Sequence, residues 1–220
     1  MLIDAAEILI GGERHLAMLP DDDRERMTWP RPLTDLMTKI SEMRGRLVCV
    51  LATGDPMFFG IGVTLVKHFA ADEMDVVPSL SAFTLAAARL GWALAEADQL
   101  TLHGRPVSLV IPFVQPGSQL LILADGPDTP AQVAEILTKR GYGGSKMTVL
   151  EHMGGADERQ LVGDAGNWGH EDIVAFHTLA VECIAGPDAV VLPRIPGLPD
   201  DAFSSDGNIT KREVRALTLS

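Results

Sequence analysis

The sequence predicts an α/β fold with two domains, on three observations. The chain has 220 residues, of which 46% are apolar and 22% charged, and these are ordinary globular proportions. Residues 47–52 form an unbroken apolar run ending at a Gly-Asp-Pro turn, which is typical of a strand buried on both faces of a parallel sheet. Strand-like runs alternate with helical spacing in the first half, and the pattern restarts at residues 119–125.

Each expected element of the first half has a local reason. A strand at 7–10 is a β-branched run closed by two glycines. A helix at 33–43 carries apolar residues at helical spacing, and a helix at 81–90 has Ser79 or Ser81 as its N-cap. The other expected elements are a polar surface loop at 20–32, a strand at 47–52, a helix at 58–70 and a strand at 74–77.

The second half begins after glycine and proline turns at 104–106 and 115–118, and we place a domain boundary there. The expected domains are 1–115 and 116–205, followed by a linker and the start of a further segment at 206–220. Thr129 and Pro130 open a helix that runs to residue 140. Strands are expected at 119–125, 146–151, 158–162 and 172–176, and a Thr-x-x-Glu capping box starts a helix at 210.

Composition excludes several classes of function. The chain has 18 basic and 30 acidic residues and a net charge of −12, which argues against binding nucleic acid or an anionic membrane. Cys49 and Cys183 lie in apolar runs and are expected to be reduced core thiols, too few for a four-cysteine zinc site. The six histidines lack metal-ligand spacing, so no metal site is expected. No apolar run is long enough to span a membrane and no leader is visible, so the cytoplasm is the expected compartment.

The most informative stretch is 54–60, which reads Gly-Asp-Pro-Met-Phe-Phe-Gly. It follows a buried strand at its carboxyl end, where α/β sheets bind their ligands. Gly54 allows a close turn, and Asp55 supplies an acceptor for a ligand or caps the next helix. Residues 78–82 form a second connection between an expected strand and an expected helix. A capped turn without ligand remains the alternative for both. The phosphate-loop and dinucleotide patterns are absent, which disfavours ATP and NAD enzymes.

Two clusters join a cation to a flexible turn. His103, Gly104 and Arg105 form one, and residues 12–15, Gly-Glu-Arg-His, form the other. Such a cation is suited to a substrate carboxylate, and plain loop polarity is the alternative reading. The three aspartates at 21–23 indicate a solvated loop.

Together these stretches resemble the tetrapyrrole methylases, which methylate porphyrin-like rings with S-adenosylmethionine. The resemblance covers nearly the whole chain and rests on residues 11–16, 53–62, 79–81, 86–91, 102–106 and 206–215. It is strongest to members that methylate carbon 5 of a precorrin in cobalamin (vitamin B12) biosynthesis. In those members a second half methylates carbon 15 and decarboxylates, and residues 206–215 resemble the junction into that half.

The resemblance implies two α/β domains with the methyl donor in a cleft between them. The implied donor-binding residues are Gly54, Asp55, Pro56, Phe58, Ser81 and Ala82 from the first part, with Ala124, Asp125, His152 and Met153 from the second. Arg14, His103 and Arg105 are the candidates for the substrate's carboxylates. A sulfonium methyl is already activated, so alignment and water exclusion carry the chemistry and no catalytic base is assigned. The family also implies a homodimer, with the C15-methylating half fused or associated.

The sequence departs from the family at its start, where the first strand and its glycine-rich donor loop are missing. Two alternatives stay open. One, which is independent of this departure, is a precorrin methylase for another ring carbon. The other, which the missing loop supports, is a non-catalytic half that binds the tetrapyrrole and passes it to a partner.

Overall fold

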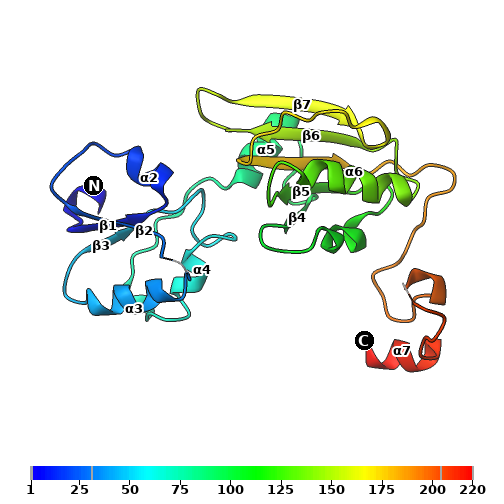
Figure 1. The fold of residues 1–220 in the computed structure, drawn as a ribbon, viewed down its shortest axis with the longest axis horizontal. Helices are drawn as coiled ribbons and strands as arrows, with labels where there is room; N and C mark the ends of the chain where they lie inside the picture. The colour runs from blue at the N-terminus through cyan, green and yellow to red at the C-terminus, as the bar shows by residue number, and fades with distance from the viewer. Residues whose placement is uncertain (1, 31, 204, 220) are drawn as a thin grey trace. The chain divides into compact units, whose positions relative to one another are not determined.

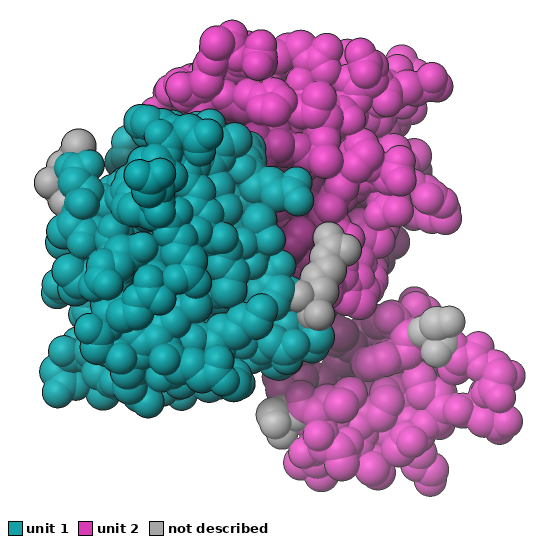
Figure 2. All heavy atoms as spheres, turned by 60° about the vertical axis from the view of Figure 1, so that its left-hand side comes forward, with its two compact units in different colours: residues 1–81 teal, residues 82–220 magenta. Residues whose placement is uncertain are grey.

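A computed structural model describes residues 2–30, 32–203 and 205–219, and the chain divides into two compact units. Unit 1 comprises residues 1–81 and unit 2 comprises residues 82–220 (Figure 2). Each unit has its own sheet and its own helices, so each has the α/β character that the sequence predicts (Figure 1).

The sheet of unit 1 is parallel and is centred on β1 (Ile8–Gly11). It pairs on one side with β2 (Glu25–Thr28) and on the other with β3 (Val48–Val50). Every residue of β1 is buried because it has a strand on each side, whereas β3 is half-buried. The helices are α1 (Leu2–Ala5), α2 (Glu13–Ala17), α3 (Asp35–Glu42) and α4 (Gly62–Leu65), with the 3₁₀ turn η1 (Ala71–Glu73).

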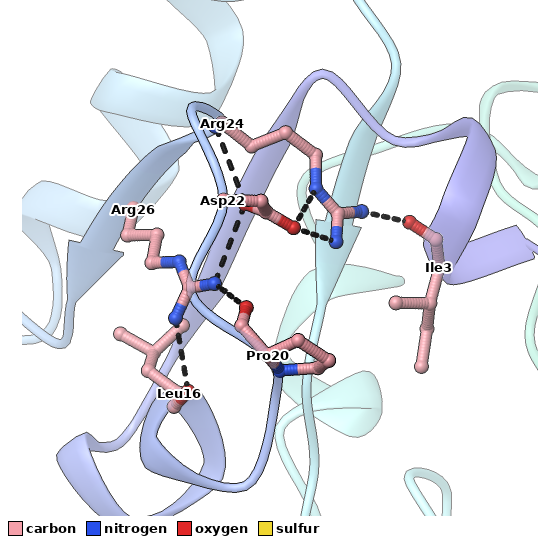
Figure 3. Close-up of polar contacts among 6 residues, drawn as sticks. All are labelled: Ile3, Leu16, Pro20, Asp22, Arg24 and Arg26. Atoms are coloured by element: carbon pink, nitrogen blue, oxygen red, sulfur yellow. Dashed lines mark hydrogen bonds and ion pairs between the residues drawn. The ribbon is translucent and has the colours of Figure 1, made fainter.

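The strand β2 lies inside the segment expected to be a surface loop, and arginines explain its order. Asp22 accepts a hydrogen bond of 2.8 Å from Nε of Arg24, whose guanidinium also donates to the backbone carbonyl of Ile3 (Figure 3). Arg26 donates to the carbonyl of Leu16 at 3.2 Å and also reaches Asp22. The Arg24 hydrogen bond lowers the pKa of the Asp22 carboxyl to about 2. Polar side chains therefore tie this strand to α1 and α2 without an apolar run to signal it.

The sheet of unit 2 has five described strands in the order β4-β5-β8-β6-β7. They are β4 (Asp98–Thr101), β5 (Gln119–Leu123), β6 (Lys146–Glu151), β7 (Arg159–Asp164) and β8 (His177–Glu182). β4 and β5 are parallel, and β8 is antiparallel to both β5 and β6. The carboxyl ends of β4, β5 and β6 therefore meet at one edge of the sheet.

Helices cover both faces of this sheet. Alternate strand residues such as Leu120, Ile122 and Val149 pack with α6 (Thr129–Lys139) in the larger core, which includes the fully buried Tyr142. The residues between them, including Leu121, Leu150 and Ala180, pack under α5 (Ala82–Leu90). The short 3₁₀ segments η2 (Val107–Phe113) and η3 (Ala165–Asn167) border the larger core.

The last part of unit 2 holds η4 (Asp200–Ala202) and α7 (Arg212–Thr218). Arg215 is buried, donates to Asp200 and to the carbonyl of Leu198, and lies 4.8 Å from the ring centre of Phe203. One arginine therefore organises this segment.

Several expected elements are confirmed and others are corrected. The strands expected at 7–10, 47–52, 119–125, 146–151 and 158–162 are present, with the bounds given above. The strands expected at 74–77 and 172–176 are wrong, because neither segment pairs with another strand and Val76 and Val77 are 41% and 57% exposed. The helix expected at 58–70 is shortened to α4. Residue 115 falls inside unit 2, between the paired strands β4 and β5.

Both cysteines are free, with Cys183 buried and Cys49 half-buried. Burial raises the pKa of the Cys183 thiol to about 12, as expected for an inert core side chain. None of the helices described is long and apolar enough to cross a membrane.

Candidate functional site

In unit 1 the expected Gly-Asp-Pro stretch lies at the carboxyl end of the sheet, directly after β3. Gly54 has φ +60°, a conformation that glycine adopts without steric cost. The Asp55 carboxylate accepts a hydrogen bond of 2.8 Å from the backbone N–H of Met57, and the Asp55 carbonyl accepts one from Phe58. Within the described residues the second carboxylate oxygen has no protein partner. Asp55 thus shapes the turn through one carboxylate oxygen, and the other oxygen accepts no hydrogen bond from the described part of the chain.

The rest of this loop winds closely around one carbonyl group. A Cβ on Gly60 or on Gly62 would lie 2.6 Å from the carbonyl oxygen of Pro56, so only glycine fits at both positions. Phe58 and Phe59 are 38% and 46% exposed, and their ring centres lie 5.0 Å apart. Phe59 has φ +57°, which is strained for an aromatic residue. The loop therefore presents two aromatic rings beside a glycine backbone.

Arg14 and His15 lie beside this loop because β1 and β3 are parallel and end at the same edge. His15 Nε2 is 2.9 Å from Thr53 Oγ1, and Arg14 donates to the same oxygen at 3.4 Å. Desolvation by burial, and then the charge of Arg14, lower the pKa of His15. Its Nδ1 atom is buried and has no partner among the described residues. The sequence indicated Arg14 and His15 in one cluster and Thr53 as part of the resemblance, whereas the contact of both side chains with Thr53 emerges only from the fold.

In unit 2 the expected residues gather at the edge where β4, β5 and β6 end. Leu123 of β5 and Leu150 of β6 both face Thr178 of β8 in the register of the sheet. Ala124 and His152 therefore follow the ends of strands that stop at nearly the same level. The structure brings together His103 and Arg105 after β4, Asp125 after β5, and His152 and Met153 after β6 at this edge.

Arg105 lines a small hollow of about 130 Å³ between the ends of β4 and β5 and the start of α6. Asp125 accepts a hydrogen bond of 2.7 Å from Gly104, and its carboxylate lies 3.4 Å from His103 Nδ1. Thr129 accepts hydrogen bonds from the N–H groups of residues 125 and 126. The hollow is lined by Leu102, Arg105, Val107, Asp125, Gly126, Asp128, Thr129 and Gln132. Its size suits a carboxylate side arm, because pockets for whole drug-sized ligands measure about 300–1,000 Å³.

The segment after β6 is a tight turn with an unusual backbone. His152 has φ +46°, and its ring centre lies 5.7 Å from that of Phe176. Met153 packs against the core under α5, the helix that begins at Ala82. Ser81, directly before that helix, is buried. The expected residues thus form one group in unit 1 and a second group in unit 2.

Among residues 2–30, 32–203 and 205–219, no three His, Cys, Asp or Glu side chains are close enough together to hold a metal ion.

The family of the chain follows from its sequence. The sequence profile of a family described as Tetrapyrrole (Corrin/Porphyrin) Methylases matches residues 2–168, which is most of the chain. The chain therefore belongs to the tetrapyrrole methylases, and the resemblance given by its motifs is confirmed.

Named relatives carry more detail. The precorrin-6Y C(5,15)-methyltransferase (decarboxylating) of Sinorhizobium sp is 43% identical over 220 residues, which make up 100% of this chain and 53% of that protein. The chain thus spans about half the length of this curated relative. The cobalt-precorrin-7 C(5)-methyltransferase of Salmonella typhimurium is 34% identical over 159 residues, 71% of this chain and 77% of that protein.

A solved structure agrees with the fold class. The precorrin-6Y methylase of Archaeoglobus fulgidus superposes with a TM-score of 0.62 at 28% identity, covering 83% of this chain and 88% of that one. The predicted α/β class is confirmed.

Proposed function

We propose that the chain transfers a methyl group from S-adenosylmethionine to carbon 5 of a precorrin in cobalamin biosynthesis. One observation carries the choice of carbon 5. The relative from Salmonella typhimurium, most of whose length this chain covers, is named for carbon 5 alone. The longer Sinorhizobium relative is named for carbons 5 and 15, and this chain spans about half of it.

The residues in unit 1 suit the methyl donor. Exposed aromatic rings at Phe58 and Phe59 offer faces for an adenine base, and the free oxygen of Asp55 offers an acceptor for hydroxyl or amino groups. Gly54 lets backbone approach a ligand closely. We assign Gly54, Asp55, Pro56 and Phe58 to the donor, together with Ser81, Ala82, Ala124, Asp125, His152 and Met153.

The cations suit the substrate. Precorrins carry carboxylate side arms, and a carboxylate in a small hollow needs a cation because the protein as a whole carries −12. Arg105 lines such a hollow and has no ion pair among the described residues. We assign Arg105 and His103 to one carboxylate and Arg14 to another.

The reaction depends on the alignment of the methyl donor with the ring carbon more than on acid–base catalysis. When bound, S-adenosylmethionine would supply an activated methyl group: an electron-rich ring carbon can bond to the methyl carbon while the methyl–sulfur bond breaks and its electron pair stays on sulfur, leaving S-adenosylhomocysteine. The loop at 54–62 and the turn at 152–153 would hold the donor, and the arginines would fix the ring. Exclusion of water around the donor then protects the reacting atoms.

The test is methyl transfer with defined substrates. The chain is incubated with isotopically labelled S-adenosylmethionine and the precorrin that lacks only the carbon 5 methyl, and the product is located by NMR. Label at carbon 5 is expected. Label at another carbon would select the alternative ring position. Tetrapyrrole binding without S-adenosylhomocysteine binding would select the non-catalytic half.

Two partners complete the proposal. We assign the C15-methylating and decarboxylating activity to a fused or associated second half, because the name of the longer relative includes carbon 5, carbon 15 and decarboxylation. Two copies of the chain would pair as a homodimer, which sedimentation at micromolar concentration tests. A monomer alone under those conditions would refute the pairing.

A further inference from the structure

The loop between β6 and β7, residues 152–158, carries two of the residues assigned to the methyl donor, His152 and Met153. It is named the β6–β7 loop below. A side chain within the loop holds the loop's backbone, because the Glu158 carboxylate accepts a hydrogen bond of 2.7 Å from the N–H of Gly154. Two backbone bonds tighten it further, from Gly155 to the carbonyl of His152 at 2.9 Å and from Glu158 to that of Gly155 at 3.3 Å.

The same carboxylate of Glu158 also binds Arg89 of α5, outside the loop. Arg89, in the last turn of α5, donates from Nε to one oxygen of Glu158 at 2.5 Å and from Nη2 to the other at 2.9 Å. This bidentate geometry fixes direction as well as distance. The guanidinium, followed by the Gly154 N–H, lowers the pKa of Glu158 to about 2, so the carboxylate is ionised across the physiological range.

One ion pair therefore connects two donor-binding segments. α5 begins at Ala82, next to Ser81, and ends with the turn that carries Arg89. Met153 packs on the side chains of this helix, including Phe83, Ala86 and Ala87. The contact between Arg89 and Glu158 is a second attachment of the loop to the same helix, at its last turn.

The backbone at His152 needs such support. Its φ of +46° is unfavourable for a non-glycine residue and persists only where surrounding contacts hold it. At the base of the loop, the buried Glu151 accepts hydrogen bonds from Arg159 at 2.6 Å and from the N–H of Val174 at 2.9 Å. Glu151 therefore fixes the residue before His152, and Glu158 fixes the residues after it.

We propose that Arg89 and Glu158 are positioning residues for the methyl donor, holding the β6–β7 loop so that His152 and Met153 are preorganised for binding. This inference rests on the proposed function. It predicts an effect on the donor out of proportion to the effect on stability, since exposed ion pairs add little to folding.

A matched control exists in unit 1. Arg44 binds both carboxylate oxygens of Glu73, at 2.8 and 3.4 Å, and Glu73 accepts a further bond of 3.1 Å from the N–H of Ala70. The arrangement is the same as that of Arg89, Glu158 and Gly154. Neither Arg44 nor Glu73 is assigned to the donor or the substrate, so this pair reports what such a contact does structurally.

The experiment compares Arg89→Ala, Glu158→Ala and the double variant with Arg44→Ala and Glu73→Ala. We expect the first three to weaken S-adenosylhomocysteine binding and raise the KM for the donor about tenfold, with kcat at saturating donor close to that of the wild type. Arg89→Lys keeps a charge but loses the bidentate contact and should recover part of the affinity. In the unliganded protein, the Gly154 amide should exchange faster in Glu158→Ala.

The outcomes separate this inference from the proposed function. A wild-type chain that binds no S-adenosylhomocysteine overturns both. Wild-type binding with unchanged affinity in Arg89→Ala and Glu158→Ala overturns the positioning role alone. An equal loss of donor affinity in the Arg44 and Glu73 variants also overturns it, because the effect would then be general. Additive effects in the double variant would show that the two residues act separately and would refute the pair.

Discussion

The carbonyl oxygen of Pro56 lies 2.6 Å from the position that a Cβ on Gly60 would occupy. A Gly60→Ala substitution therefore has to move backbone, because the opposing atom cannot rotate away. Overpacking of this kind costs about 1–3 kcal/mol, and we expect it to displace the rings of Phe58 and Phe59. The expected result is a lower melting temperature and weaker S-adenosylhomocysteine binding, measured by calorimetry.

The control for Gly60→Ala is Gly169→Ala, where the nearest atom to a new Cβ is 4.0 Å away. This control should leave both the melting temperature and the affinity unchanged. Unchanged donor affinity in a folded Gly60→Ala protein would mean that the loop at 54–62 does not contact the donor.

Asp55→Ala should weaken donor binding by about 1–3 kcal/mol, the scale of a lost hydrogen bond to a polar group. The substitution also removes the 2.8 Å bond to Met57, so Asp55→Asn serves as the comparison because its amide oxygen keeps that bond. Loss in both variants would assign the effect to the second carboxylate oxygen. Asp23→Ala, at an exposed position, should have no effect. Isothermal titration with S-adenosylhomocysteine measures all three.

The pH dependence of stability should carry a contribution from His177. Its side chain is buried, desolvation lowers its pKa, and its Nε2 atom has no partner among the described residues. A histidine whose folded pKa is depressed stabilises the protein above its unfolded pKa of about 6.5, and that contribution is lost as pH falls through the folded value. The free energy of unfolding should therefore fall between pH 7 and the acid range.

His177→Gln should flatten this fall by up to about 1.4 kcal/mol per pH unit, whatever it does to absolute stability. Chemical denaturation at several pH values gives the slope. His68→Gln, at an exposed position, should leave the slope as in the wild type. A His177→Gln slope equal to that of the wild type would contradict the assignment.

Local patterns predicted much of this fold because buried strands require runs of apolar residues, and such runs are visible in the sequence. β1 and β5 are runs of buried apolar residues, and both were predicted within a residue or two. Gly54 and Asp55 were predicted as a site because a strand end followed by a turn is visible locally. The strand β2 was missed since its order depends on Arg24 and Asp22, whose contact with Ile3 spans distant sequence.

Tertiary pairing explains the remaining differences. Residues 102–118 contain glycines and prolines that suggest a domain boundary, yet Asp98 to Thr101 of β4 pair with Leu120 to Leu123 of β5 across that segment. The approach of His15 to Thr53 joins positions 38 residues apart, and no sequence period signals it. Local composition indicates which residues are buried. It does not indicate which strands pair, because pairing depends on contacts between residues that are distant in the sequence.

Arg105→Ala should weaken binding of the precorrin while leaving the donor unaffected. Arg105 lines the hollow at the ends of β4 and β5 together with Asp125 and Asp128, so its removal leaves two carboxylates facing an anionic side arm. The loss should therefore include repulsion as well as a missing ion pair, and it should be weaker at high salt because screening reduces both. We expect the substrate KM to rise about tenfold or more, the scale of a charge-assisted hydrogen bond.

Two further variants serve as controls for Arg105→Ala. Arg105→Lys should recover part of the lost substrate affinity, and Arg140→Ala, at the far end of α6, should leave the substrate KM unchanged. Steady-state kinetics at two salt concentrations, with the donor varied separately, would measure this. A higher donor KM with an unchanged substrate KM would reverse the assignment and give Arg105 to the donor.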